Sequence, residues 1–151
     1  YHFSDIRDLT VWVFKREVAD QIIAHATYED WSDGLLAMFV WMQNHPEETR
    51  SVVSSLGMED LQIFLHKQLR AVMEPIVDQH SADLPVTEDD RVFVTDHFTL
   101  AILGHISQWL ATGMSADPYI LTERIARVLD GQVRRSLEAL AANPIPAATR
   151  A

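Results

Sequence analysis

Seven histidines are the side chains best suited to metal chemistry in this sequence of 151 residues, and their spacing decides whether they can act together. No two of them lie three or four residues apart, so no pair would share one face of a helix, as a helical metal site requires. The Glu-x-x-His and His-Glu-x-x-His patterns are also absent. We therefore expect no metal site from His2, His25, His45, His66, His80, His97 and His105.

Other groups that can act in catalysis are not arranged for it. The sequence has no cysteine, no glycine-rich phosphate loop and no Gly-x-Ser-x-Gly motif. The paired carboxylates Glu47-Glu48 and Asp89-Asp90 stand where helices are expected to begin, and the helix dipole favours acidic residues there. The sequence predicts a protein that is not an enzyme and that needs no cofactor. An unrelated helical-bundle enzyme or metal protein is the alternative.

The composition is that of a globular protein with a strongly acidic surface. Hydrophobic residues make up 48% of the chain and charged residues 23%, which is ordinary. The formal net charge of -10 at pH 7 repels phosphate, so this segment is not expected to bind nucleic acid by itself. No apolar run approaches the ~20 residues that cross a bilayer, and no secretion signal is visible. We therefore expect a cytoplasmic protein without a membrane partner.

Helix caps and helix breakers divide the chain into about six expected helices and no strand. Thr87 and the Asp117-Pro118 pair suit helix starts, whereas Gly57 and Gly113 suit helix ends. Long helices joined by short loops predict an all-α antiparallel bundle. A loose proline- and alanine-rich tail is expected over residues 143–151. The expected helices span residues 4–25, 31–44, 46–57, 59–79, 87–112 and 117–142.

The first nine residues carry a recognisable motif, Tyr-His-Phe-Ser-Asp-Ile-Arg-Asp-Leu. This motif resembles the Tyr-x-His-Phe-x-x-Lys-x-x-Leu segment that ends the DNA-binding head of TetR-family transcriptional regulators. The His-Phe pair and the leucine match, whereas Ile6 stands at the lysine position, next to Arg7. The resemblance implies that residues 1–3 close a helix-turn-helix head whose remainder is absent. It also implies that Tyr1, His2 and Arg7 contact the DNA backbone.

A second block resembles the C-terminal domains of the same family. Gly104 lies within an expected helix, a Trp-x-x-x-Gly motif begins at Trp109, and an Asp-Pro pair opens the last helix. This order is similar to the subgroup that includes regulators of dihydroxyacetone-kinase genes, as is the stretch 27–31. The resemblance implies that residues 4–142 form a helical ligand-binding and dimerisation domain of a bacterial regulator.

That family resemblance also implies how the protein works. It implies a homodimer that binds operator DNA through its heads, as a repressor, and is controlled by a small apolar or aromatic effector. Control by a protein partner, or no ligand at all, is the alternative within the family. The effector pocket is expected between the first, second, fourth and fifth helices, with ordinary core packing as the alternative for each residue. Its candidates are Trp12, Phe39, Met42, Phe64, Met73, Phe93 and a polar anchor, His97.

The same resemblance places the dimer contact on the last two helices. Apolar residues at helical spacing form one stripe on each of these helices. Packing inside a single subunit is the alternative for both stripes. Gly104 in mid-helix lowers the stability of the helix by about 1 kcal/mol relative to alanine. The close approach of another helix would explain why a glycine stands there. The candidate interface residues are Phe98, Ala101, Ile102, His105, Trp109, Leu121, Ile125 and Val128.

Overall fold

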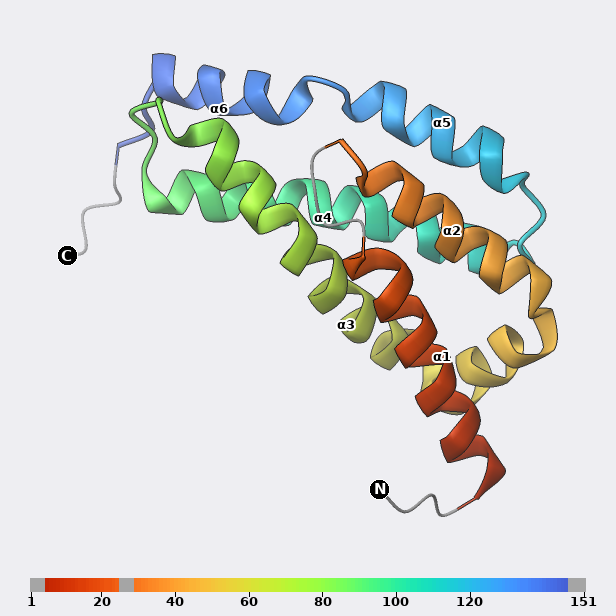
Figure 1. The fold of residues 1–151 in the computed structure, drawn as a ribbon. Coiled ribbons are helices and arrows are strands. Elements are labelled where there is room, and N and C mark those ends of the chain that lie inside the picture. The colour runs from red at the N-terminus through yellow and green to blue at the C-terminus, as the bar shows by residue number, and fades with distance from the viewer. Residues whose placement is uncertain (1–4, 25–28, 147–151) are drawn as a thin grey trace.

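The computed structural model describes residues 5–24 and 29–146, and every regular element within these residues is a helix (Figure 1). The prediction of an all-α fold is confirmed. In chain order, the helices are α1 (Ile6–Ile23), α2 (Trp31–Asn44), α3 (Pro46–Ser81), α4 (Glu88–Ala111), α5 (Pro118–Leu129) and α6 (Gln132–Ala142).

Several helices begin where a side chain can accept hydrogen bonds from the free N–H groups of the first turn. Asp5 accepts hydrogen bonds from two backbone N–H groups of α1, at 2.8 and 3.0 Å. At the start of α4, the side chains of Thr87 and Asp90 each accept a hydrogen bond from the other residue's backbone N–H. α5 begins with Pro118, directly after the capping carboxylate of Asp117. These starts are predictable from sequence because capping is local.

Two glycines divide the helices differently from the expectation. The helices expected over residues 46–57 and 59–79 are two arms of one element, α3, which bends at Gly57. Gly57 has φ 78° and ψ 157°, a conformation that essentially only glycine adopts. The single helix expected over residues 117–142 is instead two helices, because Gly131 adopts a left-handed conformation, φ 71°, between α5 and α6.

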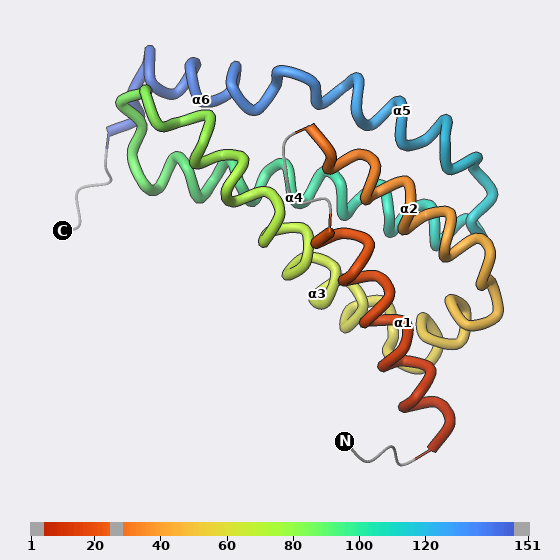
Figure 2. Tube along the Cα trace, in the orientation of Figure 1, coloured from red at the N-terminus to blue at the C-terminus, as the bar shows by residue number. Residues whose placement is uncertain are grey.

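The longest helix, α3, is the centre of the packing. It makes its most extensive contacts with α4 and α1, while α2 contacts α1 and α5. α6 packs on both α3 and α4. Figure 2 shows α5 and α6 following each other along one edge of the molecule, in the direction opposite to α4. The largest completely buried side chains are Phe14, Phe39, Met38, Met42, Leu61, Leu65, Ile106 and Leu137.

Arg134 fastens α6 to the loop between α3 and α4. Its guanidinium donates hydrogen bonds to both carboxylate oxygens of Asp83, at 2.6 and 3.0 Å, and to the backbone carbonyl of His80, at 2.8 Å. Its Nε also donates to Glu138 on the next turn of α6, at 2.8 Å. The hydrogen bond from Arg134 holds the pKa of Asp83 below its ordinary value of 3.8. A side chain late in the sequence therefore fixes a loop about fifty residues earlier.

Replacing Arg134 with glutamine is expected to lower the thermal unfolding midpoint by a few degrees, because exposed ion pairs contribute modestly. The folded-state pKa of Asp83 lies below its unfolded value. The stabilisation is therefore complete above the unfolded pKa and disappears as the pH falls through the folded pKa. Melting curves should show the difference from wild type shrinking below about pH 4. Arg135→Gln is the matched control, and a difference independent of pH would contradict this account.

Candidate functional site

An open cavity of about 430 Å³ lies where α2 begins and where α5 gives way to α6. α3 and α4 provide its floor. Its volume falls within the ~300–1,000 Å³ typical of small-molecule sites. The cavity is lined by Glu29, Trp31, Ser32, Met73, Ile76, Phe98, Ala126, Arg127, Leu129, Asp130 and Val133.

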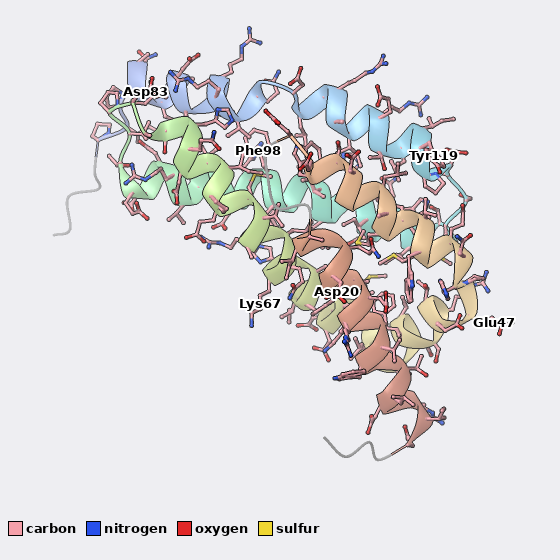
Figure 3. The ribbon with its side chains drawn as sticks, viewed as in Figure 1. Asp20, Glu47, Lys67, Asp83, Phe98 and Tyr119 are labelled. Atoms are coloured by element: carbon pink, nitrogen blue, oxygen red, sulfur yellow. The ribbon has the colours of Figure 1, made fainter. Side chains whose placement is uncertain are left out.

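The floor of this cavity is apolar and belongs to the hydrophobic core. Met73 and Ile76 reach it from α3, and Val133 reaches it from α6. Phe98, labelled in Figure 3, reaches it from α4. All four side chains are buried, so their positions are fixed by packing on the core behind them. Such a floor favours an apolar or aromatic ligand, because burying apolar surface there is worth about 25 cal/mol per Å².

The mouth of the cavity is polar. Glu29, Arg127 and Asp130 are exposed and line it. Arg127 Nε donates to Glu123 Oε1 at 2.7 Å, and both side chains of this salt bridge are largely exposed, so salt screens it. The half-buried indole of Trp31 stands between the charged mouth and the apolar floor. This arrangement offers contact area and polar groups to a ligand, which suits binding.

A second, more open cavity of about 540 Å³ lies between α2 and α5. It shares Ser32, Ala126 and Arg127 with the first cavity, so the two are adjacent. Thr122 on α5 also lines it, and its buried hydroxyl has no hydrogen-bond partner in the described part of the chain. An unmatched buried hydroxyl costs about 1–3 kcal/mol, which weakens the packing of α5 on α2.

The residues predicted to line a pocket do not gather in one place. Met73 lines the first cavity, as described. Phe39 and Met42 on α2 are completely buried in the core. Phe64 on α3 is half-buried, and the ammonium nitrogen of Lys15 lies 5.3 Å from the centre of its ring. The inward-facing positions of Phe39, Met42 and Met73 on their helices correspond to burial in the core. Of these three side chains, only Met73 lines the cavity.

Three further pocket candidates are exposed. Trp12 on α1 is 40% exposed, and Phe93 on α4 is 67% exposed. The ring of Phe93 stacks on that of His97, with 6.2 Å between the ring centres. Phe93 and His97 line a separate groove of about 580 Å³ between α4 and α6, together with Leu140 and Ile145. These candidates therefore lie on the outside of the molecule and do not line the first cavity, although Phe98 lines both that cavity and this groove.

Sequence reasoning missed several residues of the first cavity. It did not assign Trp31, Leu129 or Val133 to a pocket, and it assigned Phe98 to the subunit contact. The sequence contains one signal that could have indicated these positions, because Gly131 lies between Leu129 and Val133 within an expected helix. A left-handed glycine turns the chain, and this turn separates α5 from α6 beside the cavity.

One face of α4 is an exposed stripe of mainly apolar character. Phe93, His97, Leu100 and Gly104 follow one another at i, i+4, i+7 and i+11, which places them on one side of the helix. All four are exposed, and Leu100 is 56% exposed. An ideal Cβ atom added to Gly104 would have no heavy atom within 4 Å. Within the described subunit, no close approach explains this glycine. We call these four residues the α4 stripe.

The predicted interface residues differ in how far the subunit itself buries them. The exposed and half-buried ones can contact a second subunit while this fold is kept, whereas the buried ones already pack in the core. Phe98, Ile102, Trp109 and Ile125 are buried, Ala101 and Leu121 are half-buried, and His105 and Val128 are exposed.

The three residues predicted to contact DNA lie at the start of the chain. Tyr1 and His2 fall outside the described residues. Arg7 lies in the first turn of α1 and is exposed. Its backbone N–H donates to the capping carboxylate of Asp5 at 2.8 Å, which leaves its guanidinium out of the cap.

Across residues 5–24 and 29–146, no group of three or more His, Cys, Asp or Glu side chains is placed to hold a metal ion. In the same part of the chain, each helix is too short or too polar to cross a membrane.

The described residues form a helical fold with an open cavity of about 430 Å³. The family model for the C-terminal region of TetR-type transcriptional regulators matches residues 29–131, which covers α2 to α5. The chain therefore belongs to this family and contains the C-terminal region of a transcriptional regulator. Family membership points to a regulator rather than an enzyme. A search of curated protein sequences gave no match.

Proposed function

We propose that this chain is the effector-binding and dimerisation region of a transcriptional repressor, and that the effector is a small apolar or aromatic molecule. The first cavity carries this proposal, because it joins a buried apolar floor, including Met73 and Phe98, to a polar mouth. An effector that prefers one arrangement of the surrounding helices shifts the population toward that arrangement. Regulation then requires no chemical reaction in the cavity.

The DNA-binding function belongs to a head that would precede α1. The net charge of -10 on this chain opposes binding to a phosphate backbone, so the operator contacts need a separate basic module. In this proposal Tyr1, His2 and Arg7 are the last contacts of that module, and α1 connects it to the cavity. In this proposal the protein acts in the bacterial cytoplasm, and its sequence resembles the subgroup that includes regulators of dihydroxyacetone-kinase genes.

We propose that a second copy of the chain covers the α4 stripe. Exposed apolar side chains such as Phe93 and Leu100 gain stability when they are covered. Gly104 carries no side chain, so a partner helix can approach α4 closely there. A two-fold axis makes the same stripe serve both subunits. His105 on α4 and Val128 on α5 are the exposed members of the predicted interface, so a second subunit can contact them without a change in this fold.

A larger side chain placed in the first cavity tests whether the effector binds there. Ala126 is half-buried and lines both cavities, so Ala126→Trp places a large ring in the space of the effector. A neutral fluorescent probe, N-phenyl-1-naphthylamine, should bind wild type and should bind this variant at least about tenfold more weakly, which corresponds to 1.4 kcal/mol. Fluorescence titration measures both affinities.

Ala71→Trp is the matched control for this experiment. Ala71 is exposed on α3 and lines none of the cavities described above, so the same ring added there should leave probe affinity unchanged. Equal affinity of wild type and Ala126→Trp would mean that the probe binds elsewhere. Absence of binding to wild type would favour control by a protein partner.

A further inference from the structure

A small space inside the core adjoins the first cavity and is distinct from the second cavity between α2 and α5. Its volume is about 20 Å³, roughly the room that one water molecule needs. All of its lining side chains are apolar, so it is expected to be dry. They include Ile22 on α1 and Leu69 on α3. We call the 430 Å³ cavity the outer chamber and this space the inner chamber.

Two side chains form the wall between the chambers. Trp31 and Met73 line both of them. Trp31 is the first residue of α2 and is half-buried, and its indole ring makes no hydrogen bond or aromatic ring contact with the described residues. Met73 is unbranched and adapts its shape readily. The wall is therefore held by packing alone, and it can move without the loss of a polar contact.

We infer that Trp31 is the specificity-determining residue of the effector site, because its indole ring sets how far an apolar ligand extends from the outer chamber into the core. This inference rests on the proposed function of the outer chamber. The outer chamber is wide and open, whereas the inner one is narrow and apolar. The ligand class that fits both is a ring-sized head with an unbranched apolar tail.

The depth of entry has a structural consequence for α1. A ligand that fills only the outer chamber leaves Trp31 in place and touches α2 to α6. A tail that displaces Trp31 enters the inner chamber and meets Ile22, which is 5% exposed on the last turn of α1. Since cores are close-packed, the added atoms must move their neighbours. The length of the ligand tail therefore determines whether α1 is displaced.

A series of 4-alkylphenols, with tails lengthened one methylene at a time, tests this inference by calorimetric titration of the full chain. In wild type, affinity should rise about fourfold for each added methylene until the outer chamber is full, and then stop rising. In Trp31→Ala the rise should continue for at least two further methylenes. Trp12→Ala removes the same side chain from a position that lines neither chamber, so its cut-off should equal that of wild type.

The possible outcomes separate this inference from the proposed function. Equal cut-offs in wild type and Trp31→Ala would overturn the role of Trp31 while leaving the outer chamber as the site. Failure of every alkylphenol to bind either protein would overturn both. Trp31→Leu provides a second variant with a smaller opening, and its cut-off should lie between those of wild type and Trp31→Ala. Circular dichroism establishes that each variant is folded before titration.

Discussion

Replacing Trp109 with alanine should lower the free energy of unfolding by about 3–5 kcal/mol, the usual cost of truncating a buried aromatic ring. Trp109 is 2% exposed and packs edge-to-face on Phe39 of α2, with 4.8 Å between ring centres. Its indole nitrogen also donates to the backbone carbonyl of Ala116, at 2.9 Å. One side chain therefore joins the end of α4 to α2 and to the loop before α5. Urea unfolding at equilibrium measures the change.

Two variants separate the contributions of Trp109. Trp109→Phe keeps most of the ring contact but loses the hydrogen bond, so its destabilisation should be clearly smaller than that of alanine. Trp12→Ala removes an exposed tryptophan from α1 and should cost less than about 1 kcal/mol. If Trp109→Ala cost as little as Trp12→Ala, the contact of Trp109 with Phe39 described above would be wrong.

Replacing Leu100 with aspartate should convert a dimer into monomers while the subunit stays folded. Leu100 is 56% exposed and lies in the α4 stripe, so an aspartate there is solvated in the free subunit. In the dimer the same carboxylate would be buried against apolar surface and would face its symmetry mate, at a cost of several kcal/mol. Light scattering at micromolar concentration should show the mass fall from two chains to one.

The control for Leu100→Asp is Ile63→Asp. Ile63 is 63% exposed on α3, outside the α4 stripe, and its substitution should leave the dimer intact. Gly104→Leu provides an independent test. It has open space in the subunit, with no heavy atom within 4 Å of the added Cβ, and leucine favours helix, so the monomer should not be destabilised. The dimer should nevertheless weaken. A dimer unaffected by both stripe variants would remove α4 from the interface.

The sequence was sufficient to predict the elements of this fold because their signals are local. Thr87 and Asp117 cap the helices that the sequence assigns to them, and apolar spacing of 3.6 residues identifies the helices themselves. Gly57 was expected to end a helix, whereas Gly131 was expected to lie within one. Whether a glycine bends a helix or separates two helices depends on what packs on either side of it. The spacing of apolar residues in the sequence does not show which elements pack there.

The direction of each apolar face was harder to predict. α4 is apolar on more than one side: Ile102 and Trp109 are buried in the subunit, whereas Phe93 and Leu100 are exposed. A periodic pattern shows that a face is apolar, but it does not show which neighbour covers that face. The cavity is harder still, because its lining comes from five helices that are spread along the sequence. Of the pocket residues expected from sequence, Met73 alone reaches it.

The position of the α5–α6 junction near the end of the chain has a consequence for biosynthesis. Ala126, Leu129 and Val133 form one wall of the outer chamber, and α6 is fixed to the rest by the contact of Arg134 with Asp83. The ribosome makes this wall after almost every other part of the domain, and domains are completed in the order of translation. A nascent chain therefore exposes α4 before it possesses a complete cavity. In the proposed dimer, pairing of subunits during translation can therefore precede binding of the proposed effector.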